Sequence, residues 1–208
     1  MEVKLKRKGE ECAATWQFAD QADIGLLQGW TGFLQTDSSD YMRDSVDFAR
    51  QASARWRNYF DQGLTTGSWD DARMRSRESP QQEFSALLVL KAAWWFESGQ
   101  TLAFAYVRRT WSAGCYLEFM AGHPMAEVSE IRGILRATLG CMAEIALATG
   151  GDWVWWEATK DSFPKYERIV GQANLLTESE PRVKDVFLVK AATLQSLLNE
   201  YGKPTVVA

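Results

Sequence analysis

Apolar residues recur at helical spacing in two stretches near the start of the chain. The first stretch contains Ile24, Leu27, Trp30, Phe33 and Leu34, and the second contains Met42, Val46, Ala49, Ala52, Trp56, Tyr59 and Phe60. Residues three or four apart share one face of a helix, so each stretch predicts an amphipathic helix. The polar run 38–40 supplies N-cap chemistry before the second helix. Ahead of both helices we expect one strand, at either 3–6 or 13–18.

Residues 63–80 have no apolar periodicity. They are rich in glycine, serine and aspartate, and they carry the spaced arginines Arg73, Arg75 and Arg77. Small and polar residues between periodic segments are typical of loops. The sequence therefore predicts a long loop that ends at Pro80.

After Pro80 the pattern becomes that of β-structure. Residues 84–96 are mostly apolar, residues 101–110 alternate and are rich in β-forming types, and residues 115–121 form a third strand-like run. Turn-forming residues separate these runs at 97–100 and 112–114. Three consecutive strands joined by short turns predict an antiparallel meander.

The remainder of the chain alternates between helical and strand patterns. A long amphipathic helix, ended by the pair Gly150-Gly151, is predicted by Ile131, Ile134, Leu135, Leu139, Met142, Ile145 and Ala146. A short strand at 153–158, a short helix at 163–171 and a strand at 186–190 follow. A strand–helix–strand crossover after a meander predicts an α/β fold, in which a mixed sheet carries helices on both faces.

A last helix is expected at 193–201, where Leu194, Leu197, Leu198 and Tyr201 form one apolar stripe. A helix this short is not stable alone in water, so its stripe must pack on other residues. Packing on its own domain is our preferred interpretation, and docking on a partner chain is the alternative. We expect one domain over residues 1–192, followed by a C-terminal helix and tail over 193–208.

The composition is that of a globular protein, with 46% hydrophobic and 24% charged residues. The longest apolar runs are shorter than the roughly 20 residues of a membrane span. The first residues lack the apolar stretch of a signal peptide. Together these features predict a cytoplasmic protein that does not bind membranes. The net charge of −4 argues against general nucleic-acid binding.

Cysteine and histidine are too few for several kinds of chemistry. The three cysteines are scattered without ligand spacing, which predicts reduced thiols. The chain has one histidine, His123, which excludes a multi-histidine metal site, so we expect no metal. Because His123 precedes a proline, we interpret it as part of a turn. The ten tryptophans are interpreted as packing residues.

Three segments resemble motifs of one family. Residues 116–124, Tyr-Leu-Glu-Phe-Met-Ala-Gly-His-Pro, are similar to the fourth strand of GNAT acyl-CoA N-acetyltransferases. Residues 133–139, Gly-Ile-Leu-Arg-Ala-Thr-Leu, resemble the start of that family's long helix, and residues 166–171, Tyr-Glu-Arg-Ile-Val-Gly, resemble its C-terminal tyrosine motif. The resemblance covers about residues 84–190. It implies a sheet that splays into a V beyond 115–121, with the strand at 153–158 parallel to it.

The resemblance also implies a site for acetyl-CoA as co-substrate. Phosphate groups bind where backbone N–H groups converge at a helix N-terminus, which places the pyrophosphate at Arg132, Gly133, Ile134, Leu135 and Arg136. The pantetheine arm would pair with the backbone of Met120 and Gly122. Tyr166 would protonate the departing thiolate, and Glu118 would accept a proton from the attacking amine.

One part of the resemblance is incomplete. The family's phosphate loop has a glutamine or arginine three residues before its first glycine and a small residue two after it, whereas this chain has Glu130 and Leu135 around Gly133. We therefore keep two hypotheses of different classes: an N-acetyltransferase for a small-molecule or protein amine, and a catalytically inactive GNAT-fold module that binds or assembles, as a homo-oligomer or in a larger particle. An unrelated α/β binding domain is a third.

Overall fold

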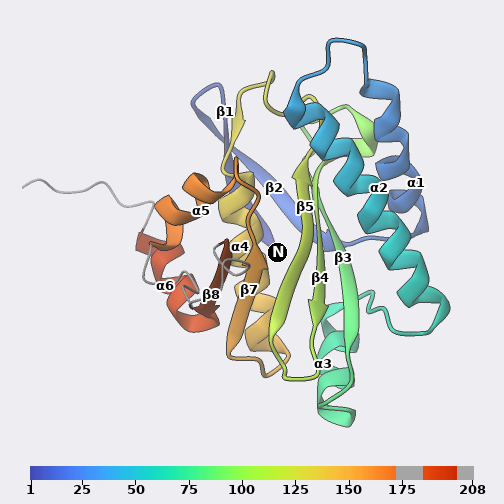
Figure 1. The fold of residues 1–208 in the computed structure, drawn as a ribbon, viewed down its shortest axis with the longest axis vertical. Coiled ribbons are helices and arrows are strands. Elements are labelled where there is room, and N and C mark those ends of the chain that lie inside the picture. Colours follow the sequence, from blue (N-terminus) through green and yellow to red (C-terminus); the bar gives the residue numbers. More distant parts are fainter. Residues whose placement is uncertain (172–184, 201–208) are drawn as a thin grey trace, which may run out of the picture.

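One mixed sheet organises the molecule (Figure 1). The computed structural model describes residues 1–171 and 185–200, and the strands within them pair in the order β6-β1-β2-β3-β4-β5-β7-β8. All neighbouring strands are antiparallel except β5 and β7, which run parallel. The strands are β1 (Glu2–Arg7), β2 (Glu10–Phe18), β3 (Phe84–Lys91), β4 (Thr101–Arg109), β5 (Cys115–Gly122), β6 (Ile131–Arg132), β7 (Trp153–Glu157) and β8 (Val186–Lys190). The predicted meander and mixed sheet are confirmed.

Helices cover both faces of the sheet, as predicted. One face packs against α1 (Gln21–Gln28), the 3-10 helix η1 (Gly29–Phe33) and α2 (Asp40–Asp61). The other face packs against α4 (Ile134–Ala148), α5 (Phe163–Val170) and α6 (Ala191–Glu200). Figure 1 shows α1 and α2 on one side of the central strands and the other three helices on the opposite side. Two apolar cores, one on each face, therefore hold the sheet between them.

The prediction of one N-terminal strand is wrong, because two strands are present. Both candidate segments are strands, β1 and β2, and they pair as an antiparallel hairpin. The turn consists of Lys8 and Gly9, both with positive φ (49° and 89°). Turns with two positive φ values match the twist of paired strands. β1 also pairs with β6, which lies at one end of the sheet.

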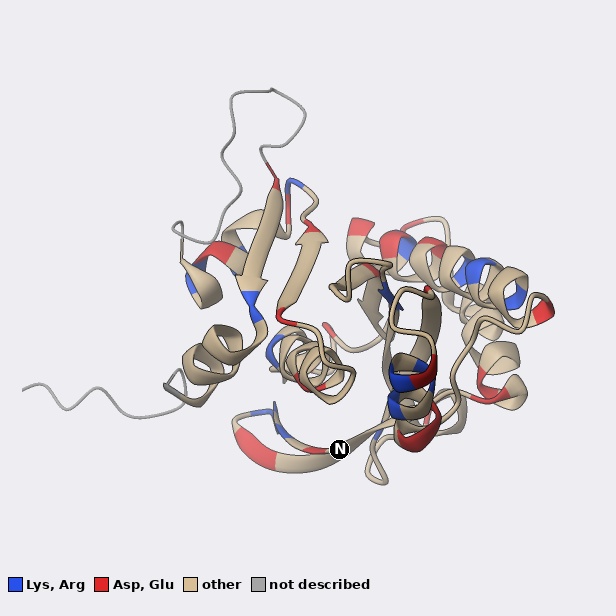
Figure 2. Cartoon of the chain, turned by 90° about the horizontal axis from the view of Figure 1, so that it is seen from below, with Lys and Arg blue, Asp and Glu red and all other residues tan. Residues whose placement is uncertain are grey.

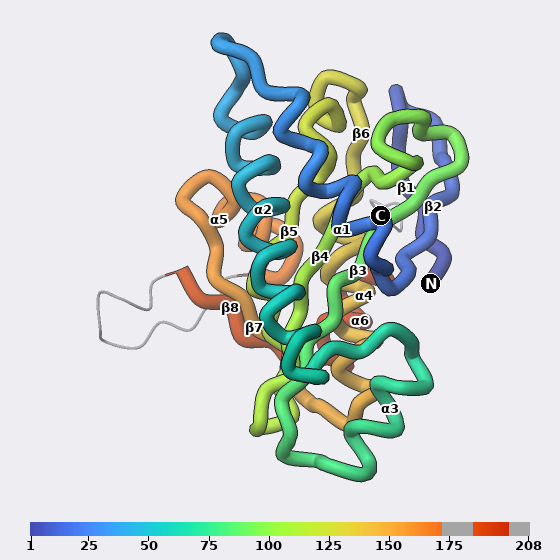
Figure 3. Tube along the Cα trace, turned by 90° about the vertical axis from the view of Figure 1, so that its right-hand side faces the viewer, coloured from blue at the N-terminus to red at the C-terminus, as the bar shows by residue number. Residues whose placement is uncertain are grey.

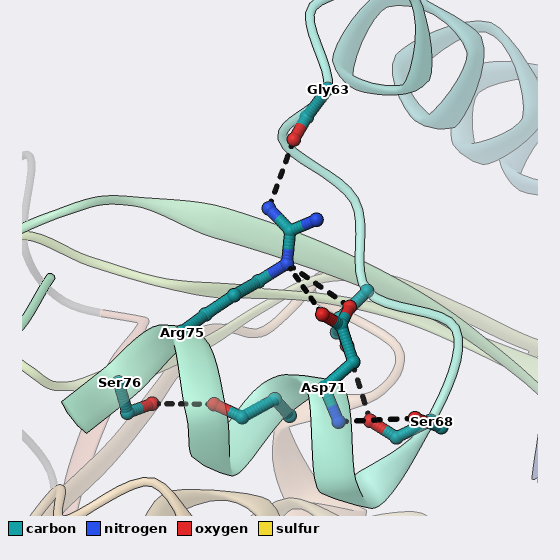
Figure 4. A network of polar contacts seen from close by, with 7 residues as sticks. Gly63, Ser68, Asp71, Arg75 and Ser76 are labelled. Carbon is teal, nitrogen blue, oxygen red and sulfur yellow. Dashed lines mark hydrogen bonds and ion pairs between the residues drawn. The ribbon is translucent and has the colours of Figure 1, made fainter. Parts of the chain in front are cut away.

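The loop prediction for residues 63–80 is wrong as well, because Trp69–Glu78 form α3. This helix lies at the lower end of the molecule (Figure 3), and Ala72 is its one buried residue. Local polar contacts hold the helix (Figure 4): the backbone N–H of Asp71 donates to Ser68 Oγ, and Arg75 Nε donates to the Asp71 carboxylate at 3.0 Å. Arg75 also donates to the carbonyl of Gly63 at 2.9 Å. The sequence signal for α3 is therefore its capping residues rather than apolar periodicity.

The parallel pair β5–β7 is short. Residues 115–117 pair with 154–156, and no further pair joins these two strands among the described residues. A β-bulge follows, because Tyr106 pairs with Phe119 and Val107 with Leu117, which leaves Glu118 as the extra residue. Bulges bend a strand and increase its twist. The predicted splay is present, and it begins inside β5, directly after Leu117.

The C-terminal helix packs on its own domain. Leu194 and Leu198 of α6 are buried in the core that also contains α4. A Cβ placed on Gly140 of α4 would lie 3.7 Å from a methyl of Leu198, so the two helices are in close contact. Leu197 of the predicted stripe is partly buried against the same core, and Tyr201 lies outside the described residues. None of the helices in the described part of the chain is long and apolar enough to cross a membrane.

Candidate functional site

The edge of β5 that faces β7 is open beyond the bulge. β4 pairs with β5 along its whole length, but β7 pairs with residues 115–117 alone within the described structure. The backbone of 118–122 therefore offers hydrogen-bonding groups to a further extended segment. Sheet edges of this kind bind extended ligands through main-chain hydrogen bonds. Met120 and Gly122, both predicted to bind the donor, lie in this segment.

Tyr166 on α5 lies against the open part of β5. Its hydroxyl is 3.5 Å from Met120 Sδ, and its ring packs on Trp156 and Phe187. Tyr166 is only 4% exposed. Burial raises the pKa of its hydroxyl, so the group keeps its proton at neutral pH. The structure thus brings together Tyr166 and Met120, which are distant in sequence, and gives the hydroxyl a weak thioether acceptor as partner.

The last residue of β5 meets α4. A Cβ on Gly122 would lie 3.1 Å from Ile134 Cδ1 and 2.5 Å from the hydroxyl of Tyr41, so only glycine leaves these side chains in place. Tyr41, which the sequence did not single out, donates a 3.4 Å hydrogen bond to the carbonyl of His123. Burial raises the pKa of Tyr41 to about 12. The end of β5, α2 and the start of α4 therefore converge at Gly122.

Gly133 forms the N-cap of α4 in the left-handed conformation, with φ of 97°. Within the described residues, no side chain caps this helix. The N–H groups of a first helical turn point along the axis, and the helix dipole adds a partial positive charge. Gly133 and Ile134 therefore form a helix start that is suited to an anion.

A groove of about 1460 Å³ runs beside α4, bounded by β1, α5 and α6. Its basic side chains are Lys4, Lys6, Arg132, Arg136, Lys165 and Arg168, and its acidic ones are Glu2, Glu11, Glu127, Glu130 and Glu144. Both signs of charge are also interspersed over the helices when the molecule is seen from below (Figure 2). Arg136 donates to the carbonyl of Leu198, so one of its N–H groups serves packing of α6. The groove thus combines basic side chains with carboxylates.

The groove brings together most of the predicted phosphate-binding residues. Arg132, Gly133, Leu135 and Arg136 line it, whereas Ile134 contacts the Gly122 position instead. Lys165 and Arg168 line it too, and sequence reasoning missed them. Both lie within two residues of Tyr166 on α5. This closeness to Tyr166 in the sequence was the signal that could have identified them.

Glu118 lies on the opposite face of the sheet, next to α2. Its side chain is 9% exposed and sits between two guanidinium groups, with Arg55 Nε 3.0 Å from Oε1 and Arg108 Nε 2.9 Å from Oε2. Both oxygens of this carboxylate are therefore paired with a guanidinium group. Neither arginine was predicted, because their approach to Glu118 depends on how α2 packs over β4 and β5. Tyr116 shares the face of Glu118, as expected, and stacks on Trp155.

His123 opens a turn, as predicted, because the N–H of Ala126 donates to its carbonyl at 2.8 Å, and its side chain is fully buried. Its ring lies among those of Trp30, Phe33 and Trp95, with centroid distances of 5.1, 4.6 and 5.2 Å. The backbone N–H of Met125 donates to Nδ1, so Nε2 carries the proton and donates to Ser98 Oγ at 3.0 Å. Burial lowers the pKa of His123 to about 4. His123 is therefore neutral at pH 7 and joins η1 to the end of β5.

This chain resembles known proteins in structure and not in sequence. Neither a protein-family model nor a curated protein matches the sequence. The GNAT domain of PAT from S. lividans is 13% identical, with 91% of this chain and 96% of that domain covered and a TM-score of 0.51. PaiA N-acetyltransferase from Thermoplasma acidophilum, solved in complex with coenzyme A, is 11% identical, with coverage of 85% and 98% and a TM-score of 0.50.

Nourseothricin acetyltransferase is 18% identical but matches over 51% of this chain and 65% of its own length. Its TM-score of 0.36 is too low to bear on the fold. At identities this low, the likeness to PAT and PaiA supports the arrangement of strands and helices alone. The chemistry must be argued from the residues of this chain.

Proposed function

Because this chain has the fold of the GNAT acetyltransferases, we propose that it transfers an acetyl group from acetyl-CoA to the nitrogen of an amine. One observation carries the proposal: the hydroxyl of Tyr166 lies beside Met120 on the strand segment that β7 leaves open. The reacting end of a thioester needs an acid that protonates the leaving thiolate. It also needs an unpaired strand edge whose backbone groups bind it. The PaiA structure, with its bound coenzyme A, supports this choice of donor.

The donor would bind along two surfaces, the open edge of β5 and the start of α4. Its pantetheine arm is a chain of amides, which suits the open backbone at Met120 and Gly122. Its pyrophosphate suits the uncapped N-terminus of α4 at Gly133. Arg132 and Arg168, both in the groove, would pair with the remaining phosphate charge.

In the transfer, the amine nitrogen bonds to the acyl carbon and the bond between carbon and sulfur breaks. The thiolate that leaves takes the proton of the Tyr166 hydroxyl, and the amine gives up its proton to Glu118 or to water beside it. Tyr166 and Glu118 return to their starting states by exchange with solvent, so one N–H is replaced by one S–H. For Glu118 to act in this way, the amine must reach a carboxylate oxygen that already pairs with a guanidinium group.

A second candidate is a GNAT-fold module that binds or assembles without catalysis. The observation in its favour is the groove at the N-terminus of α4, where Glu127 and Glu130 add negative charge near the expected phosphates. Leu135, in the position of a small residue of the family pattern, also lines this groove. Both features weaken the binding of an anion, and donor binding is therefore the property that separates the two candidates.

A calorimetric titration with acetyl-CoA tests the proposal. We expect saturable heat and a higher melting temperature, since a ligand that binds only the folded state stabilises it. Gly133→Ala should abolish both effects. Gly150→Ala is the matched control, because Gly150 also has a positive φ (72°) but lies at the other end of α4. Each alanine costs roughly 1–2 kcal/mol of backbone strain, so loss of binding in Gly133→Ala alone would identify the site.

The same titration can also contradict the proposal. Absence of heat and of any melting shift at millimolar acetyl-CoA would reject the enzyme and favour the binding module.

A further inference from the structure

The outward side of β7 and β8 is mostly apolar. Alternate side chains of these two strands are fully buried against α4, α5 and α6, and the others point away from those helices. The outward set, which we call the β7–β8 face, consists of Trp153, Trp155, Glu157, Val186, Leu188 and Lys190. Four of these six residues are apolar, and the Trp153 side chain is 40% exposed. A sheet face that meets water normally carries polar residues, so the β7–β8 face has the composition of a covered surface.

The hairpin of β1 and β2 shows how the same chain builds an exposed sheet face. The corresponding exposed positions are Glu2, Lys4, Lys6, Glu11, Ala13 and Thr15. All but Ala13 are polar or charged, and Lys4 and Glu11 form an exposed ion pair at 3.0 Å. The two faces therefore differ in composition, although both belong to antiparallel strand pairs near the ends of one sheet.

The helices α1 and α2 stop short of the β7–β8 face. The core beneath them contains residues of β3, β4 and β5 and, within the described residues, none of β7 or β8. Figure 1 shows α2 on one side of β5 and the strands β7 and β8 on the other. Trp155 stacks on Tyr116 of β5 with ring centroids 3.8 Å apart, so the face continues as far as β5.

The two charges of the β7–β8 face lie at opposite ends of the strand pair. Lys190 pairs with Trp153 at one end, and Glu157 pairs with Val186 at the other. Neither Lys190 nor Glu157 forms an ion pair in the described part of the chain. A two-fold axis that reverses the strand direction lays the Lys190 end of one copy over the Glu157 end of another. The face is therefore complementary to itself in charge.

We propose that the β7–β8 face is the interface of a homodimer, in which two copies pack face to face about a two-fold axis. Each Lys190 pairs with Glu157 of the other copy, and the apolar side chains of both copies meet between these ion pairs. Packed sheets of this kind cross at about 30°. A strongly acidic or strongly basic partner fits less well, because the face carries one charge of each sign.

The size of the face sets the expected affinity. It is smaller than the roughly 20–30 residues per partner of a standard interface, so we expect a dissociation constant in the micromolar range. The dimer does not depend on acetyl transfer, and its presence or absence leaves the proposed function unchanged.

Sedimentation equilibrium and light scattering of the full chain across the micromolar range test the dimer. Glu157→Lys and Lys190→Glu each turn two ion pairs of the dimer into two like-charge pairs, and each should weaken it by roughly ten-fold. An equimolar mixture of the two variants should recover the original affinity, because the lysines of one chain then face the glutamates of the other. Glu10→Lys is the matched control, since Glu10 is exposed on β2, and it should dimerise as the unaltered chain does.

Three outcomes overturn the proposal. A chain that stays monomeric up to millimolar concentration would leave the β7–β8 face to a different partner. A dimer that neither charge reversal weakens would have its interface elsewhere. Weakening without recovery in the mixture would contradict the reciprocal ion pairs. If one single variant fails to fold, the double variant with both reversals in one chain decides, since it should dimerise like the unaltered protein.

Discussion

Tyr166 packs in the core, and the proposed function adds a chemical role to this packing. Its ring is enclosed by Trp156 and Phe187, while its hydroxyl has a thioether as its neighbour. A thioether is a weak acceptor, so the hydroxyl contributes little to folding. Its placement at the open edge of β5 is better explained by the proposed chemistry than by stability.

Replacing Tyr166 by phenylalanine separates these roles. The ring contacts persist, so we expect the melting temperature and the affinity for acetyl-CoA to stay nearly constant. Turnover with a primary amine should fall on the order of 10²-fold or more, because the leaving thiolate loses its acid. Steady-state kinetics beside a thermal melt measures both effects. Equal turnover in the two proteins would return Tyr166 to a packing role alone.

His123 makes the stability of the protein depend on pH. Its pKa is about 4 in the folded chain, below the ordinary value near 6.5. Between these values the unfolded chain binds a proton that the folded chain does not, so stability is lost as pH falls. We expect a loss of up to about 3 kcal/mol between pH 6.5 and pH 4.

Denaturant titrations across this range check the prediction. Carboxylates titrate in the same window, so the control is His123→Gln, which keeps polar groups at the position without a titrating ring. The difference between the two curves should be steep above pH 4 and flat below it. Parallel curves would show that His123 is not the group responsible.

At the scale of the element, α3 shows how polar contacts define a helix that has almost no apolar face. Ser68 caps it, Asp70 and Asp71 lie in its first turn, and Arg75 and Arg77 lie in its last turn. This order of charges suits the helix dipole. The helix therefore depends on its cap more than on its packing.

Removing the cap should have a measurable cost. Ser68→Ala should lower the free energy of unfolding by about 1 kcal/mol, the typical value of an N-cap hydroxyl. Ser76→Ala serves as the control, because Ser76 lies inside the same helix and donates to the carbonyl of Ala72. It should be neutral or slightly stabilising, since alanine favours helices. Chemical denaturation compares the variants, and equal losses in both would contradict the capping role.

At the scale of the whole molecule, α6 completes the core on the α4 face. Ala191 and Leu194 are fully buried and Leu198 is 7% exposed. The contact with α4 supports self-packing rather than docking on a partner. The groove that would bind the donor is partly built from this helix, since Gln195, Leu198 and Asn199 line it.

Deleting residues 191–208 should therefore destabilise the protein. Burying one leucine is worth about 1.5–3 kcal/mol, so the loss of two predicts about 3–6 kcal/mol. Deleting only 201–208 is the control, because it leaves α6 in place. Thermal melts and light scattering measure stability and mass together. A longer deletion that melts normally and changes only its oligomeric state would show that α6 serves assembly.

The sequence alone determined the order and type of most elements. The meander over 84–121, the long helix before Gly150 and the crossover to 153–158 follow from periodicity, which depends on neighbours a few residues apart. The positions of Tyr166, Gly122 and Gly133 were also predictable, because each belongs to a short motif on one element. Capping residues around 68–71 carried the remaining local signal, for α3.

Only the tertiary structure decided how those positions act together. It placed the Tyr166 hydroxyl on Met120, opened the edge of β5 after Leu117, and set Glu118 between Arg55 and Arg108. These contacts join residues on separate helices and strands, and no local pattern encodes them. The physical reason is that a side chain's partners depend on how whole elements pack, whereas its secondary structure depends mainly on its neighbours in the chain.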